Sequence, residues 1–195
     1  MDLVLATGNA HKTREIQRIL GPDFVVGDLS AFPEIPPIVE SGKSFNENAA
    51  LKAIGVSREL PGLIIADDSG LEVDALDGAP GIYSARYAGE NAPDQQNIDK
   101  LLGELRSRRV PPLEATARFH CVIALARESK LVGTFEGIVE GKVVDPPRGT
   151  AGFGYDPVFL PNGFTKTFGE LEAAEKDRVS HRARALRKLR TSLLA

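Results

Sequence analysis

The feature that most constrains the fold is a short apolar run that ends in two adjacent acids. In the stretch GLIIADDSGLEVD, residues 62 to 74, the run from Leu63 to Ala66 is followed directly by Asp67 and Asp68. A short apolar run of this kind, bounded by turn residues, indicates a buried strand. We therefore expect a strand that ends in an Asp-Asp turn and brings carboxylates to one neighbourhood of the fold.

The bulk composition excludes several classes of protein. The net charge is −3, with 24 Lys and Arg against 27 Asp and Glu, so no overall basic field draws the chain to nucleic acid or a membrane. The single cysteine, Cys121, has no partner within the chain, which favours core packing in a reducing compartment. The sequence begins without a signal-peptide pattern and has no apolar run of membrane-spanning length, so we expect a cytoplasmic protein.

The rest of the chain alternates helical and extended patterns. Helical spacing is predicted over 12–20, 44–60, 94–105 and in two C-terminal helices, the last of which starts near Ser180. Extended segments are predicted over 3–6, 24–26, 63–66, 116–127, 131–139, 142–144 and 158–160. Because helices interleave with strands while 116–127 and 131–139 form a hairpin, the pattern predicts an α/β protein with a mixed sheet.

Two local signals add detail to these elements. Ser44 followed by Glu47 matches the capping-box pattern, so Ser44 is expected to cap the helix and Glu47 to reach back. Glu140 and Gly141 indicate a turn before the segment 142–144.

A glycine-containing turn between the first strand and the first helix is the first candidate site. The amides of a helix N-terminus suit phosphate, a glycine allows close approach, and a lysine can neutralise a phosphate oxygen. An ordinary strand-to-helix turn with a solvated lysine is the alternative. The residues concerned are Thr7, Gly8, Asn9, Ala10, His11 and Lys12.

The segment ESGKS, residues 40 to 44, resembles a nucleotide-binding phosphate loop only superficially. The earlier glycine of that loop falls on Pro37, and no apolar strand precedes it. We therefore assign Ser44 to helix capping, which leaves Glu40 just outside the helix as a possible ligand.

The two acids form the third candidate site. Side chains alternate along a strand, so Asp67 and Asp68 are expected to face opposite sides and need not share one role. Carboxylates at a strand end suit a hard cation such as Mg²⁺, which prefers oxygen ligands. Side chains that only satisfy the amides of a turn are the alternative.

The basic C-terminal run is the fourth candidate. Arg184, Arg187, Lys188 and Arg190 are interpreted as a solvated helical face, because leucines occupy the opposite side. Lys176, His181 and Arg182 differ in flanking a helix start, where a ligand can meet them. Together the four candidates are typical of metal-assisted phosphoryl chemistry on a nucleotide.

Six blocks in order resemble the inosine triphosphate pyrophosphatase family, which hydrolyses non-standard purine nucleoside triphosphates such as ITP, dITP and XTP. They are LATGNAHKTREI, ESGKSFNENAALKA, IADDSGLEVDALDGAPGIYSARYAG, ARFHC, GFGYDPVF and EKDRVSHRARAL. Residues 1–195 are therefore identified as a single domain of this family. The resemblance implies an elongated mixed β-sheet with flanking helices, two lobes and a central active-site cleft, and a homodimer.

The resemblance also implies roles for particular residues. It assigns Asp68 as the proton acceptor and a metal ligand, with Glu40 as the second metal carboxylate and Mg²⁺ as the metal. Asp67 is expected either to ligate the metal or to brace the turn, and the supporting role is preferred. The implied substrate-binding residues are Thr7, Gly8, Asn9, Ala10, His11, Lys12, Ser69, Phe153, Gly154, Tyr155, Asp156, Lys176, His181 and Arg182.

Two other functions stay open at this point. A metal-dependent phosphatase acting on phosphate monoesters uses the same kinds of group but releases orthophosphate. A nucleotide sensor or an RNA-binding module would show salt-sensitive affinity for polynucleotides and no Mg²⁺-dependent turnover. The acidic net charge and the aromatic content of 6% oppose the nucleic-acid alternative.

Overall fold

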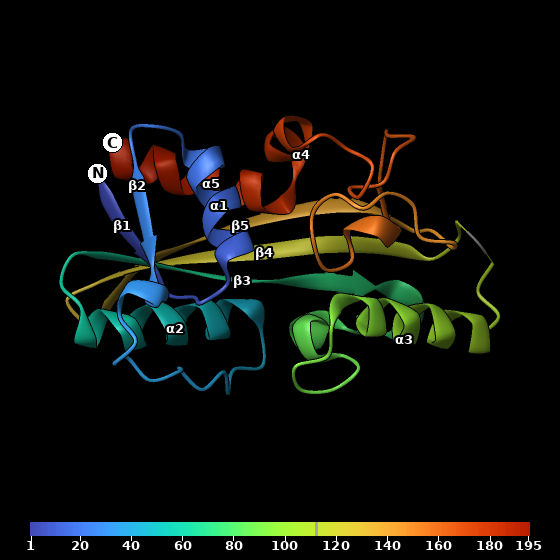
Figure 1. Ribbon diagram of the computed structural model, residues 1–195, viewed down its shortest axis with the longest axis horizontal. Helices are drawn as coiled ribbons and strands as arrows, with labels where there is room; N and C mark the ends of the chain where they lie inside the picture. The colour runs from blue at the N-terminus through green and yellow to red at the C-terminus, as the bar shows by residue number, and fades with distance from the viewer. Residues whose placement is uncertain (112) are drawn as a thin grey trace. The chain divides into compact units, whose positions relative to one another are not determined.

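A computed structural model describes residues 1–111 and 113–195 of the chain. One six-stranded sheet has the order β2-β1-β3-β4-β5-β6 (Figure 1). Its strands are β1 (Asp2–Leu5), β2 (Val25–Asp28), β3 (Leu63–Val73), β4 (Thr116–Arg127), β5 (Lys130–Val143) and β6 (Phe159–Pro161). The α-helices are α1 (Ala10–Leu20), α2 (Phe45–Glu59), α3 (Asp94–Ser107), α4 (Ala173–Val179) and α5 (His181–Leu194), and four short 3-10 helices are η1 (Leu29–Ala31), η2 (Asp74–Leu76), η3 (Gly81–Arg86) and η4 (Asp156–Val158).

The sheet is mixed, which confirms the predicted α/β class. Strand β1 pairs in parallel with both β2 and β3, whereas β5 and β6 pair antiparallel. The predicted hairpin of β4 and β5 is also present, and its two-residue loop consists of Glu128 and Ser129, both with positive φ. Two successive left-handed residues are typical of the tight turns that match the twist of paired strands.

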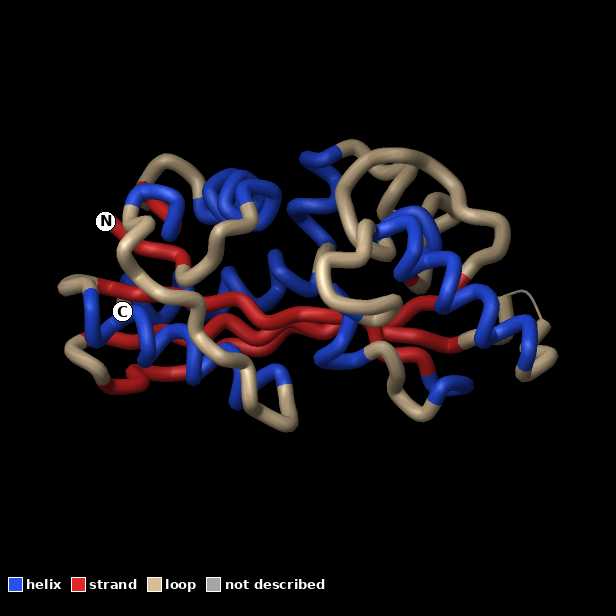
Figure 2. The backbone as a smooth tube through the Cα atoms, turned by 60° about the horizontal axis from the view of Figure 1, so that its bottom comes forward, coloured by secondary structure: helices blue, strands red, loops and turns tan. Residues whose placement is uncertain are grey.

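The chain divides into two compact units. Unit 1 contains residues 1–68, 121–137 and 181–195, and unit 2 contains residues 69–120 and 138–180. Each unit has its own hydrophobic core, so strands β3, β4 and β5 each supply residues to both cores. In unit 1, α1 and α5 cover one face of the sheet and α2 covers the other, and both chain ends lie in this unit (Figures 1 and 2). No helix among the described residues is long and apolar enough to span a bilayer.

The start of α2 follows the predicted capping pattern with one difference. Ser44 Oγ accepts from the amide of Glu47 at 3.2 Å, as expected. The Glu47 carboxylate reaches back one residue further, to the amide of Lys43 at 2.8 Å. The segment that carries Glu40 is therefore tied to the first turn of α2.

Two sequence-based predictions about strand ends were wrong. Asp67 and Asp68 do not form a turn, because β3 continues through them to Val73. Asp67 and one oxygen of Asp68 are paired with cationic side chains, and the backbone stays in the strand. Glu140 and Gly141 do not form a turn either, since β5 runs to Val143. At Gly141 a Cβ atom would lie 2.4 Å from the carbonyl oxygen of Leu160, so this glycine permits the close approach of β6 rather than a turn.

A second glycine in β5 positions helix α5. A Cβ atom on Gly137 would lie 2.1 Å from the carbonyl oxygen of His181 and 2.6 Å from the amide nitrogen of Ala185. The first turn of α5 therefore rests directly on the strand backbone. This contact fixes His181 and Arg182, which belong to the candidate site.

We expect Gly137→Ala to lower the free energy of unfolding by about 1–3 kcal/mol, because a methyl group forces backbone apart in a packed region. Gly133→Ala in the same strand is the matched control, since its nearest neighbour would be a Phe135 ring atom at 3.6 Å. Urea denaturation of both variants measures the difference. Equal stability of the two variants would contradict the close contact between β5 and α5.

Candidate active site

The turn from Thr7 to Lys12 joins β1 to α1 and is largely exposed. Asn9 caps the helix, and its Oδ1 accepts from the amides of His11 at 2.9 Å and Lys12 at 3.3 Å. The amides of His11 and Lys12, which the sequence analysis considered as phosphate ligands, therefore donate to the helix cap. Lys12 leaves the turn and points back to the sheet.

Strand alternation sends the two acids of β3 to different partners, as the sequence predicts. Asp67 is buried and accepts from Lys12 Nζ at 2.6 Å and from Arg182 Nε at 2.8 Å. The Cys121 thiol donates to the same carboxylate at 3.4 Å. These contacts give Asp67 a supporting position, although β3 does not turn there as predicted.

The charges around Asp67 determine its protonation. Burial by itself raises its pKa, but Arg182 and Lys12 outweigh this effect and hold the pKa well below the usual value of 3.8. Arg182 in turn donates through Nη1 to Glu15 at 2.9 Å, and its side chain is only 1% exposed. One buried guanidinium thus joins two buried carboxylates from β3 and α1.

Asp68 belongs to a second cluster, which centres on Lys52 of α2. Lys52 Nζ donates to Asp68 Oδ1 at 2.7 Å, to Glu40 Oε1 at 3.0 Å and to the carbonyl oxygen of Asp67 at 3.0 Å. One ammonium group therefore holds together the two carboxylates that the sequence analysis assigned to metal.

The second oxygen of Asp68 sets this carboxylate apart. Asp68 Oδ2 is buried and has no hydrogen-bond partner among the residues that the structure describes. Burial raises the pKa of Asp68 above its usual value, although Lys52 opposes the shift. A buried acceptor without a donor is costly, and such groups in native proteins call for a functional explanation.

Sequence reasoning missed Lys52, although a signal was present. Lys52 lies three residues after Ala49 and four before Val56, and both of these residues are fully buried on α2. A lysine on the apolar face of a helix indicates a buried acidic partner, because an isolated ammonium group is rarely buried. The identity of the acidic partner, Asp68 on β3, could not be predicted from the sequence of the helix.

In unit 2, a buried ion pair organises the loop GFGYD. Lys176 Nζ donates to Asp156 Oδ2 at 2.6 Å, and both side chains are almost fully buried. The same nitrogen lies 5.2 Å from the centre of the Phe153 ring and 5.7 Å from that of Phe168. The ammonium group of Lys176 therefore lies over the ring of Phe153. Phe153 is half-buried, whereas Tyr155, the other aromatic residue of the loop, is buried.

Tyr155 of the same loop has an internal role. Its side chain is buried and its hydroxyl donates to the carbonyl oxygen of Ser84 in η3 at 3.0 Å. Phe153 is consequently the aromatic residue of the loop that can offer a ring face to a ligand. Ser69, on β3, is half-buried.

The two units divide the predicted site residues between them. Unit 1 contains the Thr7–Lys12 turn, Glu40, Asp68, His181 and Arg182. Ion pairs of Lys12, Lys52 and Arg182 join the turn and Glu40 to the two acids of β3. Unit 2 holds Ser69, Lys176 and residues 153–156. The guanidinium of Arg182 is engaged by carboxylates, so direct contact of Arg182 with substrate stays a prediction.

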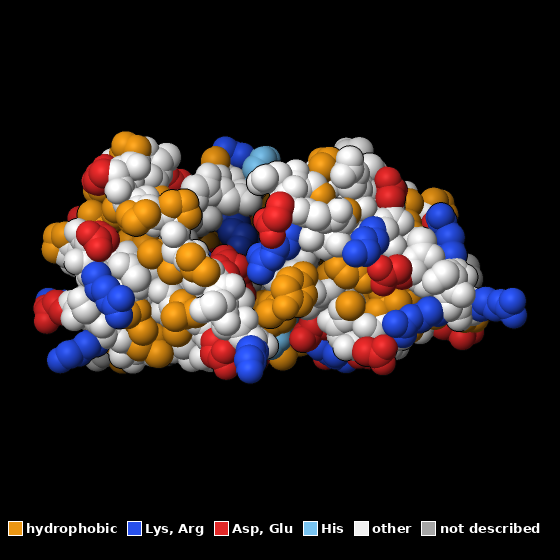
Figure 3. Space-filling model, turned by 90° about the horizontal axis from the view of Figure 1, so that it is seen from below, with side chains coloured by type: hydrophobic (Ala, Val, Ile, Leu, Met, Phe, Trp, Pro, Cys, Tyr) orange, Lys and Arg blue, Asp and Glu red, His pale blue; other side chains and the backbone are white. Residues whose placement is uncertain are grey.

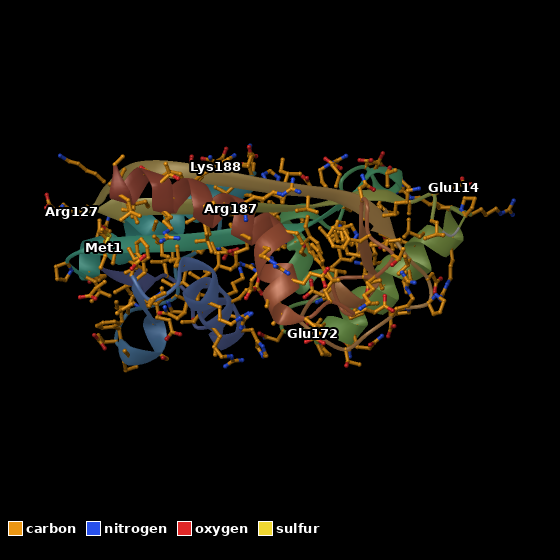
Figure 4. All side chains as sticks on the ribbon, turned by 90° about the horizontal axis from the view of Figure 1, so that it is seen from above. Met1, Glu114, Arg127, Glu172, Arg187 and Lys188 are labelled. Carbon is orange, nitrogen blue, oxygen red and sulfur yellow. The ribbon has the colours of Figure 1, made fainter. Side chains whose placement is uncertain are left out.

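The remaining basic residues of α5 lie on its exposed face, as predicted. Lys188 donates to the carbonyl oxygen of Glu136 at 2.7 Å and Arg190 pairs with Asp23 at 2.8 Å; Figure 4 labels Arg187 and Lys188 on this helix. On the face shown in Figure 3, basic and acidic side chains are interspersed. That face, which lies on the side of α2 and α3 and not of α5, does not resemble a basic surface for nucleic acid.

The donor set around Asp68 fits a magnesium ion. Among the described residues no group of three His, Cys, Asp or Glu side chains could hold a metal by itself. Mg²⁺, however, is commonly bound by one or two carboxylates with waters and substrate phosphates completing its shell. Asp68 offers its unpartnered oxygen, Oδ2, and Lys52 holds Glu40 nearby through the other oxygen, Oδ1. These two carboxylates can serve as the protein ligands of such an ion.

Comparison with known proteins identifies the family of the chain. The sequence model of the Ham1 family matches residues 3–192. A protein named dITP/XTP pyrophosphatase from Geobacter sulfurreducens is 51% identical over 98% of this chain and 96% of its own length, and one from Shouchella clausii is 48% identical over 98% and 96%. These names confirm the family resemblance that the six sequence blocks predicted.

Solved structures lead to the same assignment. A HAM1 protein from Coxiella burnetii matches with a TM-score of 0.88 at 39% identity, covering 100% of this chain and 98% of its own. The Ham1 protein of Staphylococcus aureus matches with a TM-score of 0.86, the same identity and the same coverage. On both sequence and structure, the chain belongs to the Ham1 family.

Proposed function

We propose that the protein hydrolyses non-standard purine nucleoside triphosphates, namely ITP, dITP and XTP, to the nucleoside monophosphate and pyrophosphate. The reaction is NTP + H₂O → NMP + pyrophosphate, with water attacking the α-phosphorus. The names of the relatives support this substrate class. The observation that carries the proposal is the buried, unpartnered oxygen of Asp68, held beside Glu40 by Lys52 in the unit that contains the Thr7–Lys12 turn.

Asp68 is proposed as the proton acceptor. A normal aspartate is a weak base at neutral pH, and burial improves it by raising the pKa above the usual value of 3.8. One oxygen is fixed by Lys52, so the orientation of the other is set before substrate arrives. Oδ2 can then orient a water molecule and take its proton as the new P–O bond forms.

Positive charge for the phosphates is proposed to come from Lys12 and Lys176. Lys12 Nζ donates to Asp67 at 2.6 Å, and 18% of the lysine side chain is exposed, so part of it stays open to solvent. With the turn's remaining backbone it can offset charge on the departing pyrophosphate. Lys52 stays with the carboxylates and keeps their mutual repulsion low.

The proposed metal is Mg²⁺, held by Asp68 and Glu40. When bound, it neutralises phosphate charge and helps align the triphosphate. The chain's own contribution is to hold both carboxylates close together through the shared contact with Lys52.

Base selection is proposed to reside in the loop of residues 153–156. The Phe153 ring offers a face for stacking on the purine, and Lys176 lies against that ring. A 6-oxo purine accepts hydrogen bonds at O6, whereas adenine presents an amine there. A site built to donate at this position rejects adenine because buried donors would face each other.

We further propose that residues 1–195 act as one domain in a cytoplasmic homodimer. The family resemblance supports the domain and the dimer. The buried free thiol of Cys121 supports a reducing compartment.

The proposed function is tested by incubating the protein with ITP, XTP, GTP or ATP and Mg²⁺ and identifying the products by phosphorus NMR. We expect pyrophosphate from ITP and XTP and little turnover of ATP, while GTP, which is also a 6-oxo purine, measures discrimination at position 2 of the base. Orthophosphate as the first product would favour a phosphatase. Nucleotide binding without turnover would favour a sensor.

A further inference from the structure

Phe153 lies between two peptide amides that are each held by a carboxylate. The amide of Phe153 donates to Asp156 Oδ2 at 2.9 Å, within the same loop. The next amide, that of Gly154, donates to Asp94 Oδ2 at 2.6 Å. The peptide groups on both sides of the Phe153 Cα atom are therefore fixed, and with them the direction of its side chain.

The two anchors differ in origin. Asp156 belongs to the loop and is already paired with Lys176. Asp94 is the first residue of α3, sixty positions earlier in the chain. This contact is a charge-assisted hydrogen bond to a backbone amide, and it links α3 to residue 154.

Helix α3 is itself a rigid support for Asp94. One turn later, the buried side chain of Asn97 accepts from the amide of Ala88 at 2.7 Å and donates to the carbonyl oxygens of Ala85 and Ala92. Apolar residues of α3 extend into the core of unit 2. Asp94 therefore contacts the loop from a helix that is itself anchored to unit 2 by hydrogen bonds and core packing.

Gly154 shows why an external anchor is needed. Its φ is +61°, in the left-handed region that glycine enters easily, and a Cβ atom there would meet nothing within 4 Å. A glycine in open space gives a loop freedom. The hydrogen bond from Asp94 restricts that freedom next to the residue that would contact the base.

We infer that Asp94 is a positioning residue for the nucleobase: it holds Phe153 in the orientation in which its ring can stack on the purine. The inference rests on the proposed function and extends it to a residue outside the site. Asp94 contacts none of the groups proposed for the chemistry, so it acts on nucleotide binding and not on the hydrolytic step.

The test compares Asp94→Ala and Asp94→Asn with a control at another exposed aspartate of the same helix, Asp99→Ala. For Asp94→Ala we expect the KM for ITP to rise about tenfold with kcat within about twofold of wild type, since a hydrogen bond to a charged group is lost. Asp94→Asn retains an acceptor oxygen and should recover most of the affinity. Inorganic tripolyphosphate, which has no base, should inhibit Asp94→Ala and wild type with equal inhibition constants.

A double-mutant cycle with Phe153→Ala identifies the route of the effect. If Asp94 acts through Phe153, Asp94→Ala should change KM by less than about twofold in the Phe153→Ala background. Full additivity, or a KM for Asp94→Ala equal to that of Asp99→Ala, would overturn the inference while leaving wild-type turnover intact. Absence of pyrophosphate from the wild-type reaction would instead overturn the proposed function, and this inference with it.

Discussion

Replacing Asp68 by asparagine should lower kcat for ITP by at least about a thousandfold, because a positioned general base alone contributes on the order of 10² to 10⁴. The amide is nearly isosteric but cannot take a proton from water. It is also a poorer ligand for a hard cation than a carboxylate. Pyrophosphate release under saturating ITP and Mg²⁺ measures the loss.

Nucleotide binding should survive this substitution. The groups proposed for the phosphates and the base lie elsewhere, on the Thr7–Lys12 turn and in the loop around Phe153. Calorimetric titration of Asp68→Asn with ITP should therefore give an affinity within about tenfold of wild type. Asp99→Asn, an exposed change of the same kind, is the control and should be fully active. Wild-type kcat in Asp68→Asn would remove Asp68 from the catalytic role.

Replacing Arg182 by methionine should lower the free energy of unfolding by about 3–5 kcal/mol, the range seen when one member of a buried ion network is removed. Asp67 would keep Lys12, but the buried carboxylate of Glu15 would lose the guanidinium that lies 2.9 Å away. Methionine fills much of the space of the arginine side chain. The loss of stability should therefore come mainly from the missing positive charge, since little cavity is left. Urea denaturation without nucleotide or metal measures it.

Arg190→Met on the same helix is the matched control. Its partner Asp23 is 60% exposed, and exposed pairs contribute at most about 1 kcal/mol. A loss in Arg182→Met no larger than in Arg190→Met would show that the buried network contributes little to stability.

The pH dependence of the same variant has a definite sign. In the wild type the pKa of Asp67 is depressed, so its contribution is complete above the unfolded-state pKa of about 3.9 and is lost as pH falls through the folded-state pKa. Removing Arg182 reduces that depression. The stability difference between wild type and Arg182→Met should therefore narrow as pH falls below about 4.

Local patterns in the sequence predicted most of the elements and much of the site. Ser44 caps α2 and residues 116–127 form β4, because capping and alternation are decided by near neighbours in the chain. The predicted separation of Asp67 from Asp68 onto different faces also holds, since it follows from strand geometry alone. Where a turn was predicted at these acids, the error lay in treating charge as a strand breaker.

What the sequence could not predict depends on partners that are distant in the chain. Lys52 meets Asp68 sixteen residues away, and Arg182 meets Asp67 across 115 residues. Gly141 was predicted to form a turn because the residues next to it in the sequence do not reveal the close approach of Leu160. The anchor from Asp94 to Gly154 is of the same kind, and only the folded chain shows it.

The central claim is that Asp68 directs water to the α-phosphorus of a purine triphosphate. Hydrolysis of ITP in ¹⁸O-labelled water, followed by mass spectrometry of both products, tests this claim most directly. We predict that the label appears in the phosphate group of IMP and that the pyrophosphate is unlabelled. Label in pyrophosphate, or in orthophosphate released from ITP, would mean that a different phosphorus is attacked and would contradict the assignment of this site.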